Sequence, residues 1–219
     1  MVKMVEKLIR KRPVYRGKSI NFNVDTILLP NGKKATREYL DHPGAVGVLP
    51  FLNPHTIIMV RQYRHPVEEI TYEIPAGKLH SNSESPKVCL SRELREETGY
   101  TARRIRPLLS YWPSPAFSNE ILHLFYAEDL TPGSSAPDED EFLCAFSVPY
   151  KTALQWVFQG KIQDSKTVIA LLAYEALHNR KHYTTFGSAL FSRRQRHIKN
   201  SPWPRPRHAG RQFTKEVMP

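Results

Sequence analysis

Residues 92–100 read Arg92-Glu93-Leu94-Arg95-Glu96-Glu97-Thr98-Gly99-Tyr100. In a helix, Glu93, Glu96 and Glu97 stand at positions i, i+3 and i+4, so their three carboxylates share one face. Like charges at this spacing repel by roughly 0.2–0.5 kcal/mol per pair, which a bound cation would relieve. Hard divalent ions such as Mg²⁺ bind substrate phosphates beside one or two carboxylates. The stretch therefore predicts a metal-assisted reaction at a phosphate. The alternative is a solvated acidic face that Arg92 and Arg95 partly neutralise.

The residues on either side of this stretch indicate where the helix begins and ends. Ser85 and Pro86 fit an N-cap followed by proline at the first helical position. Gly99 is a natural helix stop, because glycine adopts the left-handed conformation that often follows a last turn. These signals predict a helix over residues 86–98, preceded by a strand over residues 72–79.

The same stretch resembles the Nudix box, in which glycines and glutamates recur at fixed spacing around an Arg-Glu pair. Seven residues separate Glu84 from Arg92, and Gly99 closes the pattern, as in the box. Six residues separate Gly77 from Glu84, where the box has five, so the loop carries one extra residue within positions 80–83. This departure affects the placing of Glu84 and leaves the helix unchanged.

Segments outside the box resemble the ADP-ribose pyrophosphatase branch of the Nudix hydrolases. They are residues 60–66, 72–78, 113–120, 138–142 and 160–167. Pro115 lies fifteen residues beyond the end of the box, near the point where this branch carries a proline. The resemblance extends from about Lys18 to His178 and so covers most of the chain.

The resemblance implies how a metal is held. Glu93 and Glu97 are expected as direct metal ligands, and Glu96 as a supporting or additional ligand. Arg92 is expected to orient a glutamate of the box, and its alternative is a surface salt bridge. The backbone carbonyl of Ala76 is expected to add one more ligand.

In this branch an acidic loop elsewhere in the sequence supplies a further metal ligand or a general base. The candidates are Glu139 and Glu141, and the alternative is a solvated acidic turn. Bound metal neutralises a diphosphate, orients the attacking water and lowers the pKa of that water. We therefore predict a hydrolase that uses Mg²⁺, or Mn²⁺ in its place, to split ADP-ribose into AMP and ribose 5-phosphate. The alternatives are hydrolysis of another nucleoside diphosphate sugar, such as a GDP- or UDP-sugar, and a non-catalytic Nudix-fold protein that binds nucleotide or nucleic acid.

Substrate recognition is expected from two arginines and a short segment after the box. Arg61 and Arg64 suit phosphate, because guanidinium matches its geometry, and Arg64 is the favoured one. By strand alternation both are expected to point to one face, and their alternative is an exposed position on a strand. Trp112 and Phe117 are candidates to stack on a base or line its pocket, although large aromatic residues more often belong to a core. Pro115 is a further substrate-binding candidate.

The rest of the chain predicts an α+β fold. The Asn31–Gly32 pair indicates a hairpin between strands at 19–29 and 34–40. Further strands are predicted at 44–49, 56–62, 103–111, 122–127 and 142–148, and further helices at 150–159 and at 164–179, the latter capped by Asp164. The resemblance implies an α/β/α sandwich with a mixed sheet, plus N-terminal antiparallel strands. The expected domains are residues 1–44 as a dimerisation element, 45–180 as the Nudix domain and 181–219 as a basic tail.

Charge is unevenly distributed along the chain. The formal net charge is +11, and residues 181–219 hold nine Lys or Arg and one acid, Glu216. This tail is rich in Pro and Arg, which predicts a loosely held segment. A solubilising extension is the favoured role, and nucleic-acid binding or packing across a homodimer are the alternatives.

Composition also limits the location of the protein. No run of eighteen or more apolar residues occurs, so no membrane span is expected. The first residues lack the apolar core and cleavage site of a secretory signal, which predicts a cytoplasmic protein. The two cysteines, Cys89 and Cys144, lack metal-type spacing, and both are expected to be reduced and buried.

Overall fold

The computed structural model describes residues 4–18, 20–136 and 142–178. Its elements, in chain order, are β1 (Lys7–Arg10), β2 (Pro13–Arg16), β3 (Asn21–Leu28), β4 (Lys34–Asp41), β5 (Ala45–Asn53), β6 (Thr56–Arg64), the 3₁₀ turn η1 (His65–Val67), β7 (Glu69–Glu73), β8 (Ala76–Lys78), α1 (Pro86–Thr98), β9 (Tyr100–Tyr111), β10 (Leu122–Pro132), β11 (Leu143–Pro149), α2 (Tyr150–Phe158) and α3 (Ser165–His178).

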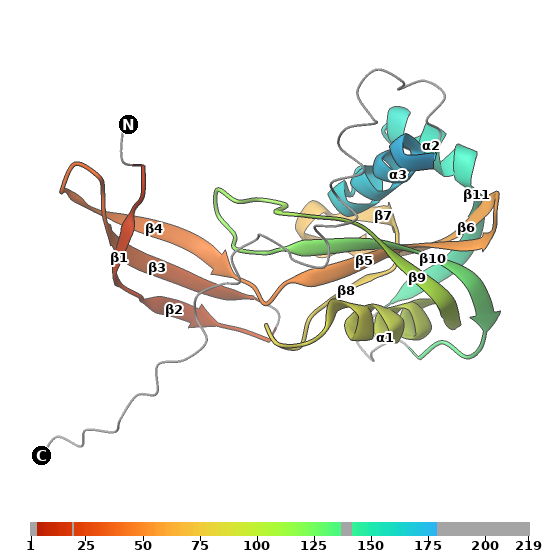
Figure 1. The fold of residues 1–219 in the computed structure, drawn as a ribbon, viewed down its shortest axis with the longest axis horizontal. Coiled ribbons are helices and arrows are strands. Elements are labelled where there is room, and N and C mark those ends of the chain that lie inside the picture. The colour runs from red at the N-terminus through yellow and green to blue at the C-terminus, as the bar shows by residue number, and fades with distance from the viewer. Residues whose placement is uncertain (1–3, 19, 137–141, 179–219) are drawn as a thin grey trace, which may run out of the picture. The chain divides into compact units, whose positions relative to one another are not determined.

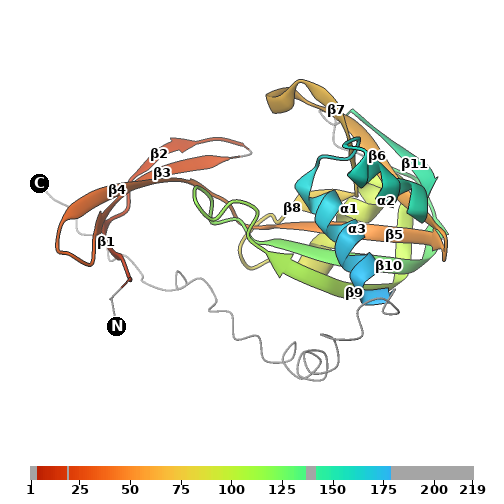
Figure 2. The same ribbon diagram turned by 90° about the horizontal axis from the view of Figure 1, so that it is seen from above.

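The larger sheet is mixed, as predicted. Its strands follow the order β11-β6-β5-β10-β9, with β7 beside β6 and β8 beside β5. Strands β5 and β10 run parallel, and the other pairs are antiparallel. Strands β5 and β6 pair with each other near their connecting turn and then diverge (Figure 2). The chain from β7 to β8 crosses this opening, where Val48 N–H donates to Pro75 O at 2.9 Å.

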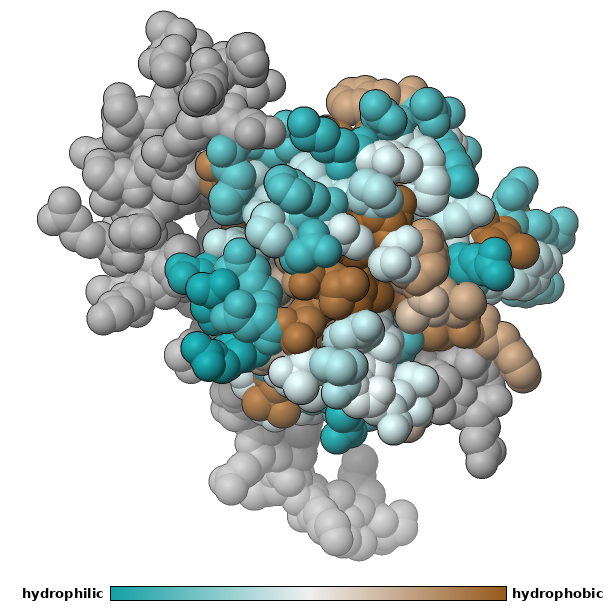
Figure 3. Space-filling view, turned by 90° about the vertical axis from the view of Figure 1, so that its right-hand side faces the viewer, coloured by the Kyte–Doolittle hydropathy of each residue, from teal (hydrophilic) through white to brown (hydrophobic). Residues whose placement is uncertain are grey.

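Alternation along β5 divides the core into two layers, because successive side chains of a strand point to opposite faces. Val46 and Val48 pack with Leu90 and Leu94 of α1. Leu49 and its neighbours on the other face pack with residues of α2 and α3. Helices therefore cover both faces of the sheet, which confirms the predicted α/β/α sandwich (Figure 1). Seen from one end, the surface carries an apolar patch near its middle, with hydrophilic residues on several sides of it (Figure 3).

The N-terminal strands form a separate antiparallel sheet. Strand β3 pairs with β4 over its full length and with β1 and β2 in turn. Gly32 closes the β3–β4 hairpin with a φ of 82°, which confirms the predicted turn. Beyond β4, Leu40 N–H donates to Phe117 O at 2.8 Å, and Asn119 Nδ2 donates to Asp41 Oδ1 at 2.8 Å. These bonds hold the end of this sheet against the loop that follows β9.

The structure corrects two details of the sequence analysis. The strand predicted at 72–79 is two strands, β7 and β8, separated by Ile74 and Pro75. Cys89 is buried and free, but Cys144 is exposed rather than buried; it lies on β11, a strand at the edge of the sheet. Among the described residues, no helix is long and apolar enough to cross a membrane.

Candidate active site

Helix α1 begins and ends where the sequence predicts. Ser85 occupies the N-cap position with extended backbone angles, and Pro86 follows as the first helical residue. Gly99 adopts the left-handed conformation with a φ of 76°, and its N–H donates to Arg95 O at 2.8 Å. The helix therefore presents its carboxylates from a fixed, well-terminated element.

Two carboxylates of α1 lie against the backbone of β8. The side chains of Glu93 and Glu97 are nearly buried, with exposed fractions of 9% and 4% for the residues. Ala76 N–H donates to Glu97 Oε2 at 3.0 Å. A Cβ placed on Gly77 would come within 3.0 Å of all three carboxylate atoms of Glu93, which real Cβ atoms essentially never do. The absence of a side chain at position 77 is therefore what makes room for Glu93.

Arg92 lies between the carboxylates of its own helix. Its Nη1 is 2.8 Å from Glu93 Oε1 and 3.0 Å from Glu96 Oε2. One cation thus reduces the repulsion between two like charges three residues apart. In the preceding loop, Glu84 Oε2 accepts a hydrogen bond from His80 N–H, so the segment with the extra residue closes on itself.

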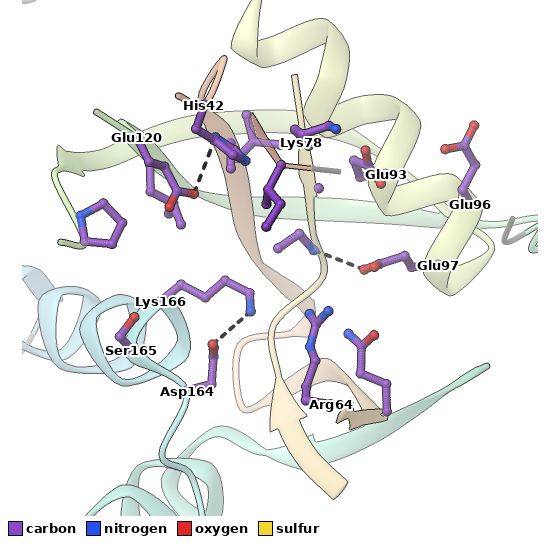
Figure 4. A pocket seen from close by; sticks show the side chains of 18 of the residues that line it. His42, Arg64, Lys78, Glu93, Glu96, Glu97, Glu120, Asp164, Ser165 and Lys166 are labelled. Atoms are coloured by element: carbon purple, nitrogen blue, oxygen red, sulfur yellow. Dashed lines mark hydrogen bonds and ion pairs between the residues drawn. The ribbon is translucent and has the colours of Figure 1, made fainter. Parts of the chain in front are cut away.

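These carboxylates open onto a cavity of about 990 Å³. The predicted residues that line it are Arg64, Ala76, Arg92, Glu93, Glu96 and Glu97. Figure 4 shows Glu93, Glu96 and Glu97 on the side of α1, and Arg64, Asp164 and Lys166 on the side of β6 and α3. The cavity therefore has an acidic wall and a wall that carries two cations.

Four other predicted residues do not line this cavity in the single chain. Arg61 lines a second hollow of about 530 Å³. The expectation that it shares a face with Arg64 is wrong, because residues three apart in a strand point to opposite faces. Trp112 and Phe117 are 46% and 55% exposed, so neither belongs to the core, and Pro115 is exposed beside them.

The wall with two cations is organised by one buried carboxylate, Glu73, which is 2% exposed. Arg64 donates from Nε to Glu73 Oε1 at 2.8 Å and from Nη2 to Oε2 at 2.7 Å. Lys166 Nζ donates to the same Oε2 and, at 2.9 Å, to Asp164 Oδ1. Burial alone would raise the pKa of Glu73, but the hydrogen bonds from Arg64 and the charge of Lys166 outweigh it and hold the pKa at about 2.

Comparison with known proteins identifies the family of this chain. The profile of the NUDIX domain matches residues 41–171. The chain belongs to the NUDIX family. It is 42% identical to the methanol dehydrogenase activator of Bacillus methanolicus, over 81% of this chain and 96% of that protein. It is also 42% identical to the ADP-ribose pyrophosphatase of Bacillus subtilis (strain 168), over 78% of this chain and 93% of that protein.

A solved structure described as an ADP compounds hydrolase has the same fold. It matches with a TM-score of 0.71 and 20% identity, covering 83% of this chain and 98% of that one. At this identity the likeness concerns the fold alone. Together with the family match, it confirms the NUDIX fold that the box predicts.

The donor set of this NUDIX domain fits a hard divalent cation. Among the described residues, no group of three or more His, Cys, Asp or Glu side chains is arranged to hold an ion by itself. Mg²⁺ does not need one, since it usually keeps several waters and binds through one or two carboxylates and substrate phosphates. Glu93 and Glu97 are two such carboxylates on the cavity wall. The candidates Glu139 and Glu141 lie outside the described residues.

The NUDIX cavity also contains residues that the sequence analysis did not assign to it. They include His42, Glu120, Ser165 and Lys166, besides Asp164, which was predicted as a cap. His42 Nδ1 accepts a hydrogen bond from Gly44 N–H at 3.1 Å. Burial lowers the pKa of His42, although the nearby Glu120 carboxylate opposes this, so the imidazole is neutral at pH 7. No local pattern marks His42, whereas Lys166 falls in segment 160–167, which resembles the family.

Acidification is expected to weaken the NUDIX domain through Glu73. The folded-state pKa of about 2 lies below the ordinary value of 4.5. The stabilisation is therefore complete above pH 4.5 and is lost as the pH falls towards 2, by roughly 3 kcal/mol in all. Urea unfolding at a series of pH values from 6 to 3 measures this slope.

Two variants test whether Glu73 causes the slope. Glu73→Gln cannot titrate, so its free energy of unfolding should fall less steeply over the same pH range, from a lower starting value. Glu69→Gln changes an exposed carboxylate on the same strand and should follow the parent protein. Equal slopes for Glu73→Gln and the parent would contradict the assignment.

Proposed function

We propose that this protein hydrolyses the diphosphate of ADP-ribose, giving AMP and ribose 5-phosphate, with Mg²⁺ as its metal. The observation that carries the proposal is the 42% identity to an ADP-ribose pyrophosphatase over 78% of this chain. The fold supports it, because the box carboxylates line a cavity of about 990 Å³. That volume is at the upper end of the range for small-molecule sites, roughly 300–1,000 Å³.

The proposed mechanism places one phosphate near each wall. Glu93 and Glu97 are proposed to hold the metal, with Glu96 and the Ala76 carbonyl in support. When bound, a divalent cation neutralises the diphosphate and lowers the pKa of the attacking water. Arg92 keeps the carboxylate of Glu93 oriented through its 2.8 Å contact.

Arg64 is proposed to bind a phosphate oxygen. Its Nε and Nη2 are fixed on Glu73, so the guanidinium is already oriented, and Nη1 is assigned to the substrate. A side chain that is ordered before binding loses less conformational entropy when it binds. Glu139 and Glu141 remain candidates for a further ligand or general base.

The protein is further proposed to act as a homodimer in the cytoplasm. Its N-terminal sheet exposes large apolar side chains, namely Leu8, Ile9, Val14 and Tyr15, and Val5 just before the sheet is exposed as well. A second copy of the chain that covers this sheet would remove them from water. Trp112 and Phe117 are then candidates to contact substrate in the assembled dimer. Sedimentation equilibrium measures the oligomeric state.

The proposal is tested by incubating the protein with ADP-ribose, with GDP- and UDP-sugars and with RNA, in Mg²⁺ or in EDTA. Release of AMP from ADP-ribose in Mg²⁺, and its loss in EDTA, are expected. Faster hydrolysis of another nucleoside diphosphate sugar would replace ADP-ribose as the proposed substrate, while the proposed hydrolysis of a diphosphate would stand. Metal-independent binding without turnover would refute the enzyme. RNA binding lost on removal of residues 181–219 would give the basic tail a role beyond solubility.

A further inference from the structure

The first turn of α3 reaches the chain between β7 and β8 through one buried hydroxyl. Thr167 is fully buried, with an exposed fraction of 0%. Its Oγ1 accepts a hydrogen bond from Ile74 N–H at 2.8 Å and donates one to Asp164 Oδ2. Asp164 Oδ2 also accepts from Thr167 N–H at 3.0 Å, which fixes this turn as the capped start of α3. The hydroxyl therefore has a defined orientation, with its O–H pointing to Asp164 Oδ2 and a lone pair of Oγ1 pointing to Ile74 N–H.

The segment that Thr167 holds is the one that positions the box carboxylates. Ile74 lies in the link between β7 and β8, and its buried N–H requires a partner. Two residues later, Ala76 N–H donates to Glu97 Oε2, and the next residue, Gly77, lies against the carboxylate of Glu93. One continuous path thus runs from α3, through Thr167 and Ile74, to both carboxylates.

We infer that Thr167 is a positioning residue for Glu97 and Glu93, acting through the backbone of residues 74–77. The inference rests on the proposed function, since it concerns the carboxylates to which that function assigns the metal. Removing a group that orients a metal ligand without touching the metal commonly lowers metal affinity or activity by about 10- to 100-fold. Because Thr167 acts through a backbone segment, the lower end of that range is expected.

The test replaces Thr167 by Val, which keeps the shape and removes the hydroxyl. Thr167→Val is expected to lower kcat about tenfold and to raise the Kd for Mn²⁺, measured by the EPR signal of the free ion, about tenfold. The KM for ADP-ribose should change by less than about threefold, because Arg64, the proposed phosphate ligand, is held by its two bonds to Glu73 and not by Thr167. Thr167→Ser restores the hydroxyl and should restore both values.

Tyr150→Phe is the matched control. Its hydroxyl also ties α3 to the core, through bonds of 3.0 Å to Leu171 O and to Glu175 Oε2, and neither of these partners lies in the 74–77 segment. It should lower the melting temperature and leave kcat and the Mn²⁺ Kd at parental values. If Thr167→Val does not fold, Thr167→Cys, whose thiol is a weak hydrogen-bonding group, takes its place.

Parental kcat and parental Mn²⁺ affinity in folded Thr167→Val would overturn the inference. So would a Thr167→Ser variant whose kcat and Mn²⁺ Kd do not return to parental values. Mn²⁺ binding does not require turnover. A parent protein that binds Mn²⁺ tightly and hydrolyses no ADP-ribose would therefore refute the proposed function, while the Mn²⁺ affinities still decide the role of Thr167.

Discussion

Replacing Glu97 by Gln is expected to lower kcat about 10³-fold and to leave the fold intact. Glutamine has the same size, and its amide oxygen can still accept the hydrogen bond from Ala76 N–H. What is lost is a negative charge where the cation is proposed to bind. A loss of roughly 4 kcal/mol of charge stabilisation corresponds to about 10³ in rate. Steady-state kinetics with ADP-ribose, beside a thermal melt, provide the measurement.

Glu96→Gln is the matched control on the same helix. Glu96 is more exposed than Glu97, and its two oxygens face the guanidinium groups of Arg92 and Arg95 at 3.0 and 3.6 Å. A supporting role predicts a loss of about tenfold, in the range of residues that act through others. Turnover at the parental rate in Glu97→Gln would show that the metal is held elsewhere.

Adding one methyl group at Gly77 is expected to lower kcat by about 10² or more. The Cβ of Gly77→Ala would overlap the carboxylate of Glu93. Position 77 lacks the positive φ that strains an alanine, so the flexible end of Glu93 moves and the strand stays. A displacement of about 1 Å at a catalytic group can cost about 10²-fold in rate.

Gly133→Ala tests whether any added methyl group has this effect. At that position a Cβ would meet a single backbone oxygen, that of Gly99, at 3.2 Å. Activity close to the parental value is expected, with a small change in melting temperature. If Gly77→Ala and Gly133→Ala are equally active, Glu93 does not need its place against β8.

Features of the site that depend on local spacing could be predicted from the sequence. The helix bounds and the shared face of Glu93 and Glu97 follow from the repeat of 3.6 residues, from Pro86 and from Gly99. The NUDIX family followed from the same stretch and is confirmed by the match over residues 41–171. These features need no knowledge of how distant segments pack.

Features that depend on pairing between distant segments could not be predicted. Ile74 and Pro75 divide one predicted strand into two because β7 pairs with β6 and β8 pairs with β5. His42 is held near the cavity by its backbone N–H, which donates to the side-chain Oδ1 of Asn119, 77 positions away. The orientation of Arg61 needed no distant pairing. Side chains alternate along a strand, so Arg61 and Arg64, three residues apart, point to opposite faces.

The divergence of β5 and β6 has a consequence for how the protein responds to its ligand. The carboxylates of α1 rest on β8, which belongs to the β5 arm, whereas Arg64 belongs to the β6 arm. A molecule that spans both walls clamps the two arms together. Occupancy then raises the free energy of unfolding by RT ln(1 + [L]/Kd). Shifts in melting temperature would rank nucleotides by affinity even where none is cleaved.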